Sequence, residues 1–133
     1  MSEPYVSAMV LADVVICDVF SDKWSLVGIF SKAWAHKFPV IIPRICCYAC
    51  LSDVSGEINP SFRILDPDLN VVRQCPVPTL TARREDEQEI GCVFPEVLMA
   101  RPGRYSVELL LDGCMVQSVR LDVVDVPTPI PEQ

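Results

Sequence analysis

The chain has 133 residues, 50% of them hydrophobic and 22% charged, a balance that excludes a disordered chain and predicts a single folded domain. Its formal net charge of −7 disfavours nucleic acid and membrane surfaces as partners. The acidic start and the short apolar runs predict neither a secretory signal nor a membrane-spanning helix, so we expect a soluble, cytoplasmic protein.

Short apolar runs rich in valine, isoleucine and aromatic residues alternate with turn residues, and no segment keeps the 3.6-residue period of a helix. The twelve prolines also disfavour long helices. The expected strands cover residues 6–19, 24–34, 40–42 leading into 44–52, 61–65, 71–74, 90–94, 105–111 and the segment around 118–123.

Local irregularities are expected within these strands. We predict a kink near Ala12-Asp13 in the first strand and a bulge or close backbone approach at Gly28 in the second. Pro43 cannot donate a ladder hydrogen bond, so it predicts an edge or a crossover between sheets. Residues 76–89, which include the charged run 83–87, are expected to form a solvated loop.

The clearest local pattern is a hairpin near the C-terminus, where apolar and polar residues alternate on both sides of Asp112-Gly113. A two-residue loop would pair Leu109 with Val116 and turn Ser118 toward the core. A three-residue loop, 111–113, would pair Leu109 with Met115 and keep the later apolar residues in phase. We therefore expect the three-residue loop.

Seven or eight strands with turns every 8 to 15 residues predict an all-β fold, specifically an antiparallel immunoglobulin-like β-sandwich. A small β-barrel is the alternative. We place one sandwich domain at residues 1–126 and a proline-rich, extended tail at 127–133.

Seven cysteines are scattered along the chain, and we expect free, mostly buried thiols. Cys47 and Cys50 form a C-x-x-C, the spacing of redox and zinc sites. In an extended strand, however, residues three apart point to opposite faces, so the pair predicts buried strand residues. We expect no metal and no cofactor.

Other chemistry-bearing residues also have structural interpretations. The single histidine, His36, could assist a cysteine nucleophile, but no motif supports catalysis, and we predict no enzyme. The carboxylates of Asp66 and Asp68 fit a turn, and those of residues 85–87 fit a loop. Trp24 and Trp34 are expected to pack in the core; one exposed beside His36 and Lys37 would become an anchor for a partner.

Several of these features together resemble a family of small bacterial proteins of unknown function. The resemblance spans roughly residues 8–124 and rests on Ala12-Asp13, Gly28-Ile29-Phe30, Phe38-Pro39, Asp66-Pro67-Asp68, Pro102-Gly103-x-Tyr105 and Asp112-Gly113. It implies an immunoglobulin-like β-sandwich and transfers no catalytic residue. The chain departs from the pattern at Leu69-Asn70, where a glycine turn is expected.

These observations favour a non-enzymatic interaction or structural module that binds another protein, or a second copy of itself, through a sheet edge or end loops. The alternative is a small-ligand or carbohydrate-binding module that uses an exposed tryptophan. An enzyme that depends on a cysteine and His36 is the third hypothesis.

Overall fold

The computed structural model describes residues 4–127, so the predicted tail lies outside the described residues beyond Pro127. Within the described part every regular element is a strand, which confirms the all-β prediction. None of its segments forms a helix of the length and apolarity needed to cross a membrane. Eleven strands are present among these residues, against seven or eight expected, because three additional strands are only three or four residues long.

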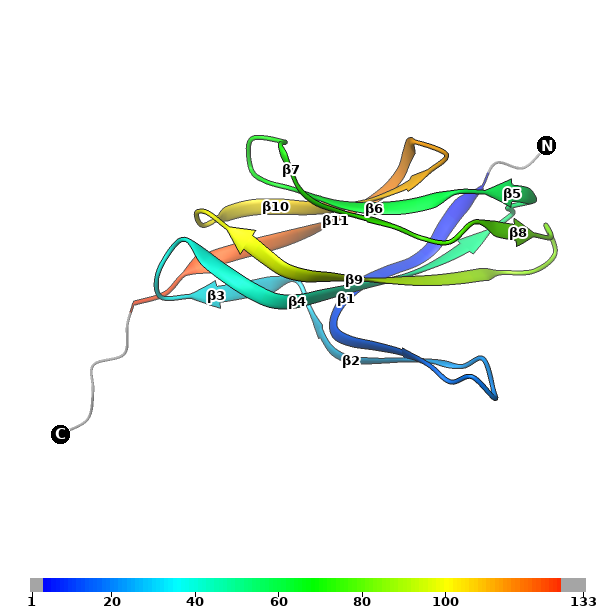
Figure 1. The fold of residues 1–133 in the computed structure, drawn as a ribbon, viewed down its shortest axis with the longest axis horizontal. Coiled ribbons are helices and arrows are strands. Elements are labelled where there is room, and N and C mark those ends of the chain that lie inside the picture. The colour runs from blue at the N-terminus through cyan, green and yellow to red at the C-terminus, as the bar shows by residue number, and fades with distance from the viewer. Residues whose placement is uncertain (1–3, 128–133) are drawn as a thin grey trace.

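Figure 1 shows two main sheets lying face to face, with one short ribbon at an end. The first sheet has the order β2-β1-β4-β9 and the second the order β3-β11-β10-β6-β7. The strands of the first sheet are β1 (Tyr5–Cys17), β2 (Trp24–Phe30), β4 (Val40–Ser52) and β9 (Gln88–Met99). Those of the second are β3 (Lys32–Ala35), β6 (Pro60–Leu65), β7 (Val71–Pro76), β10 (Gly103–Leu111) and β11 (Cys114–Asp125). The short ribbon pairs β5 (Gly56–Ile58) with β8 (Leu80–Ala82).

One contiguous apolar cluster fills the space between the two main sheets. Leu11, Ile45 and Phe94 enter it from the first sheet, and Phe62 and Leu109 from the second. Alternate residues of each strand supply the cluster, as a two-sheet arrangement requires. No backbone ladder joins the two main sheets among the described residues. The fold is therefore a sandwich, and the alternative prediction of a closed barrel does not apply.

Two features of the second sheet are those that immunoglobulin-like sandwiches share. β3 pairs with β11 in parallel, whereas the other ladders are antiparallel. The buried Tyr105, near the start of β10, donates its hydroxyl hydrogen to the Arg101 carbonyl at 2.8 Å, in the manner of a tyrosine corner. The immunoglobulin-like assignment stays a prediction that these two features support.

The expected strand over residues 24–34 is wrong in one respect, because it is divided at Ser31 between the two sheets. β2 pairs with β1 in the first sheet, and β3 pairs with β11 in the second. Pro43 lies inside β4, in the half that pairs with β9 but not with β1. The proline therefore occupies a stretch with a free edge, where the missing N–H leaves no ladder bond unmade.

The expected three-residue loop of the C-terminal hairpin is wrong. Leu111 pairs with Cys114, so Asp112 and Gly113 form a two-residue loop, with φ of 49° and 84°. Positive φ at both positions is typical of a type I′ turn. A register shift beyond Leu109 leaves Val116 unpaired, and this bulge restores the apolar phase of β11.

The loop predicted at residues 76–89 is only partly correct. The charged run 83–87 is exposed, as expected, but β8 occupies residues 80–82 and β9 begins at Gln88. The turn after β6 is confirmed, since the Asp66 carboxylate accepts the N–H groups of Asp68 and Asn70, both at 2.9 Å. These bonds, that from Asn70 above all, lower the pKa of Asp66.

Candidate functional site

The hairpin formed by the end of β1 and by β2 leaves the first sheet and folds back over its outer face (Figure 1). Pairing between β1 and β4 ends at Ala12 and Cys46, so residues 13–17 of β1 pair with β2 alone. The Asp13 carbonyl accepts a hydrogen bond from Arg44 Nε at 2.9 Å. The predicted irregularity at Ala12-Asp13 is thus the bend at which β1 changes partners.

Gly28 makes this bend possible, because it lies opposite Asp13 with φ of 71°. A Cβ at this position would overlap the Asp13 carboxylate. The close approach predicted at Gly28 is therefore present, and the group that approaches its backbone is the Asp13 side chain, with no bulge in the ladder between β1 and β2. Any other residue would be strained both by the left-handed conformation and by the contact.

The inner face of the hairpin packs on the sheet through Trp24 and Val15. The rings of Trp24 and Tyr48 have centroids 5.5 Å apart, and both Trp24 and Val15 lie against Gly91 of β9. A side chain at residue 91 would occupy the space that the indole needs. The hairpin is consequently a third layer whose position depends on the absence of a side chain at Gly91.

The opposite face of the hairpin is apolar and exposed to solvent. Ile16, Val27 and Ile29 alternate on this face, and each is at least half exposed. Together with the tip they account for five of the thirteen large hydrophobic residues that the described chain exposes. A concentration of this kind marks an interaction surface more often than scattered exposed residues do.

The hairpin tip, residues 18–23, carries the two most exposed large hydrophobic side chains in the described residues, Phe20 at 97% and Val19 at 83%. The Asp18 carboxylate accepts the N–H groups of Phe20 at 2.8 Å and of Ser21 at 3.1 Å, and these bonds lower the pKa of Asp18. The Asp18 N–H also bonds the Lys23 carbonyl at 2.9 Å. The tip therefore presents Phe20 from a hydrogen-bonded turn.

A second exposed aromatic residue, Trp34, lies on the edge strand β3 with 65% of its surface accessible. The expectation that the two tryptophans pack in the core is therefore wrong for both. Trp34 is exposed, and Trp24 is half-buried in the hairpin layer, against Tyr48 and Gly91, outside the core cluster. Trp34 lies beside a hollow of about 270 Å³ between β3 and the free-edged half of β4, and this Trp34 hollow is lined by Ala33, Trp34, Ala35, Val40, Ile41, Ile42, Pro43 and Val123. An adjoining open depression includes His36 and Lys37. Trp34 thus meets the condition stated for an anchor residue.

The C-x-x-C residues are buried strand residues, as predicted. Cys47 faces the core opposite Cys92 of β9, and burial raises the pKa of Cys47 to about 12. Cys50 donates its thiol hydrogen to Glu87 Oε2 at 2.9 Å, and burial raises its pKa as well. Thiols held in the neutral form are poor nucleophiles and poor metal ligands.

The remaining candidates do not assemble into a reactive cluster. His36 is exposed, and its Nδ1 lies 3.3 Å from the Val126 carbonyl oxygen. Asp66 and Asp68 belong to the turn after β6, where Asp68 also pairs with Arg101. Within residues 4–127, no three His, Cys, Asp or Glu side chains are grouped as a metal ion would require.

The fold and surface define an all-β protein that carries an apolar hairpin layer. A profile of a family of unknown function, DUF6941, matches residues 7–124, and the chain belongs to this family. The resemblance to an uncharacterised family is thereby confirmed. No curated protein matches the chain.

One similar solved structure is the Pseudomonas fluorescens alkylpurine DNA glycosylase AlkC bound to DNA that contains an abasic site analog. The alignment has 12% sequence identity and a TM-score of 0.58, and it covers 92% of this chain. The chain spans only 30% of the length of that glycosylase chain. At this identity the likeness concerns the fold alone.

The hairpin tip is the functional candidate that sequence patterns missed. Residues 6–19 were expected to form one strand, but β1 ends at Cys17, and Val19 and Phe20 belong to the turn. A usable signal was present, because Asp18 precedes the apolar pair and Ser21-Asp22 follows it. Two apolar residues between turn formers are residues that a turn exposes.

Proposed function

We propose that this protein is a non-enzymatic interaction module that binds another protein through the β1–β2 hairpin. One observation carries the proposal: Phe20 is 97% exposed at the tip of a turn whose backbone is fixed by hydrogen bonds. A fixed turn has little conformational freedom to lose on binding, so burial of the ring contributes to affinity with a small entropic cost. Complete burial of a phenylalanine side chain is worth about 1.5–3 kcal/mol.

A protein is the partner class that the surface favours. Val19 lies beside Phe20 in the tip, and the same hairpin exposes the apolar side chains of Ile16, Val27 and Ile29. Aromatic residues that insert into a partner's pocket are typical interface anchors. The formal net charge of −7 disfavours a phosphate backbone or an anionic membrane as the partner. DNA binding by the structurally similar glycosylase therefore does not extend to this proposal.

A cytoplasmic location is part of the same proposal, and the bacterial origin implied by the resemblance stays an expectation. All seven cysteines are free, as expected in a reducing compartment. Trapping of thiols at the moment of cell lysis, followed by peptide mapping, should find them reduced. A disulfide in the trapped protein would contradict the cytoplasmic location.

The test of the interaction is a quantitative affinity purification from the source cell with three baits: wild type, Phe20→Asp and Leu69→Asp. Leu69 is the matched control, because it is also an exposed apolar residue in a hydrogen-bonded turn. We expect specific proteins to be depleted at least tenfold with Phe20→Asp and to be retained with Leu69→Asp. Equal recovery with all three baits, or no specific protein with any, would contradict the proposal.

A second candidate function is small-ligand or carbohydrate binding at the Trp34 hollow. The observation that favours it is the exposed indole beside a concave, mainly apolar surface. Titration with a panel of sugars and small metabolites should then change the fluorescence of a Trp24→Phe variant, in which Trp34 is the only tryptophan. An unchanged spectrum across the panel would exclude this function for the compounds tested.

A further inference from the structure

We infer that copies of this chain associate head to tail, with Phe20 of one copy inserted into the Trp34 hollow of the next. The inference rests on the proposed function and names a second copy of the chain as the partner. Among the described residues, the same molecule offers both a 97% exposed aromatic side chain and a hollow lined by apolar residues. Three observations favour their pairing.

The first observation is size and polarity. The Trp34 hollow measures about 270 Å³, and a protein cavity of about 150 Å³ already accommodates benzene. The residues around the hollow all have apolar side chains, so a phenyl ring would replace water mainly against carbon atoms. Trp34 itself offers an aromatic surface for an edge-to-face or offset contact with the ring.

The second observation is charge. The hairpin tip contains two carboxylates, Asp18 and Asp22, and one cation, Lys23. At the other end of the molecule, Lys37 lies in the depression that adjoins the hollow, and Lys32 is two residues from Trp34 on β3.

Two carboxylates lie in the ladder between β3 and β11: Asp125 pairs with Ala35, and Asp122 pairs with Lys32. Asp122 also forms ion pairs with Arg104 and Arg120. The tip thus has a net charge of −1, whereas the two lysines, the two arginines and the two carboxylates at the other surface have a net charge of +2. Opposite charges at the two surfaces steer an encounter between copies despite the overall acidic charge.

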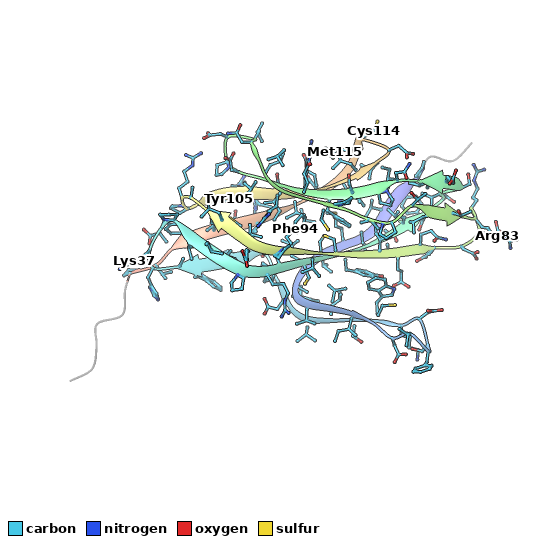
Figure 2. The ribbon with its side chains drawn as sticks, in the orientation of Figure 1. Lys37, Arg83, Phe94, Tyr105, Cys114 and Met115 are labelled. Atoms are coloured by element: carbon cyan, nitrogen blue, oxygen red, sulfur yellow. The ribbon has the colours of Figure 1, made fainter. Side chains whose placement is uncertain are left out.

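The third observation is position. Figure 1 shows the hairpin tip at one end of the longest axis and the β3–β4 turn at the other, and Figure 2 places Lys37 at that second end. The two surfaces are therefore different and far apart on one copy. A contact between different surfaces is heterologous, and it produces an open chain of copies or a closed ring rather than a symmetric dimer.

The contact is small, because the tip offers mainly Phe20 and Val19 to the hollow. Interfaces that bury less than about 1,200 Å² in total are typically transient. Association should therefore depend on concentration and be measurable by light scattering between about 10 μM and 1 mM.

The experiment is sedimentation velocity with light scattering on the full chain, with wild type compared with Phe20→Asp and Trp34→Asp. Wild type should form species larger than a dimer as concentration rises. Each variant lacks one of the two surfaces, so each should remain monomeric at the same concentrations. Both side chains are exposed, and far-UV circular dichroism checks that each variant folds. Ile41→Asp replaces Trp34→Asp if the latter does not fold, since Ile41 is another exposed residue that lines the hollow.

A mixture of the two variants gives the decisive result. Trp34→Asp retains a tip and Phe20→Asp retains a hollow, so an equimolar mixture should form a capped dimer that contains one of each. Its affinity should lie within about threefold of that of one wild-type contact, and the complex should not grow further. Wild type that remains monomeric, single variants that still associate, or a mixture that remains monomeric would each overturn head-to-tail association.

Failure of this inference is distinguishable from failure of the proposed function. A monomeric wild type that still recovers a different protein through Phe20 would overturn self-association and leave the interaction module intact. Leu69→Asp serves as the control in both experiments and should associate as wild type does.

Discussion

Gly91→Ala is the substitution that tests most directly whether the hairpin is packed on the first sheet as a third layer. An added Cβ would lie 2.7 Å from Trp24 Cζ3 and 3.3 Å from Val15 Cγ1. Gly91 is not one of the glycines with a positive φ, so the backbone at this position tolerates alanine. The only obstacle to the added Cβ is the packed hairpin. Overpacking of this kind costs about 1–3 kcal/mol, and we expect the free energy of unfolding to fall by that amount.

The part of this cost that comes from Trp24 can be isolated with a double-mutant cycle in a Trp24→Leu background. That substitution removes the ring atom 2.7 Å from the added Cβ and leaves the longer contact with Val15. In that background, Gly91→Ala should be neutral or should stabilise by up to about 1 kcal/mol, because glycine is unfavourable within a strand. The coupling energy between Gly91 and Trp24 is then about 1–3 kcal/mol. Urea unfolding followed by far-UV circular dichroism measures all four free energies. An equal cost of Gly91→Ala in both backgrounds would refute the packing of Trp24 on this strand.

Three further predictions concern the turns and the thiols. Tyr105→Phe removes the hydroxyl that bonds the Arg101 carbonyl, and urea unfolding should show a loss of about 1 kcal/mol; no loss would mean that this bond adds nothing to stability. Leu69 has φ of 68°, a conformation that is strained for leucine and not for glycine. In thermal unfolding, Leu69→Gly should therefore leave the free energy of unfolding unchanged or raise it by up to about 1 kcal/mol. A clear loss of stability would contradict strain at Leu69. The exposed Cys17 and Cys114 should react with a maleimide at least tenfold faster than the buried cysteines, as measured by mass spectrometry over time, and uniform rates would contradict the burial pattern.

The residues that could be predicted from the sequence are those whose pattern is local. The strands expected at residues 61–65 and 105–111 from alternating apolar residues are present as parts of β6 and β10. The turn at Asp66 and the close approach at Gly28 also follow from the conformational preferences of single residues. The burial of the C-x-x-C follows from the geometry of a strand.

The features that were missed depend on partners distant in sequence. Ser31 and Lys32 interrupt the apolar pattern, but nothing local to them indicates that β2 and β3 belong to different sheets. The register of the C-terminal hairpin depends on a bulge at Val116, and a two-residue period cannot encode an unpaired residue. The exposure of Trp34 arises because β3 is an edge strand beside a free-edged half of β4, a property of the assembled sheets.

The central claim is that the hairpin tip contacts another protein. A photo-crosslinking phenylalanine derivative at position 20, introduced into the chain in its source cell, tests this claim most directly, with the same derivative at position 69 as the control. We expect discrete adducts at position 20, either with a second copy of the chain or with one other protein, and none at position 69. Position 20 without adducts, or the same adducts at both positions, would contradict it.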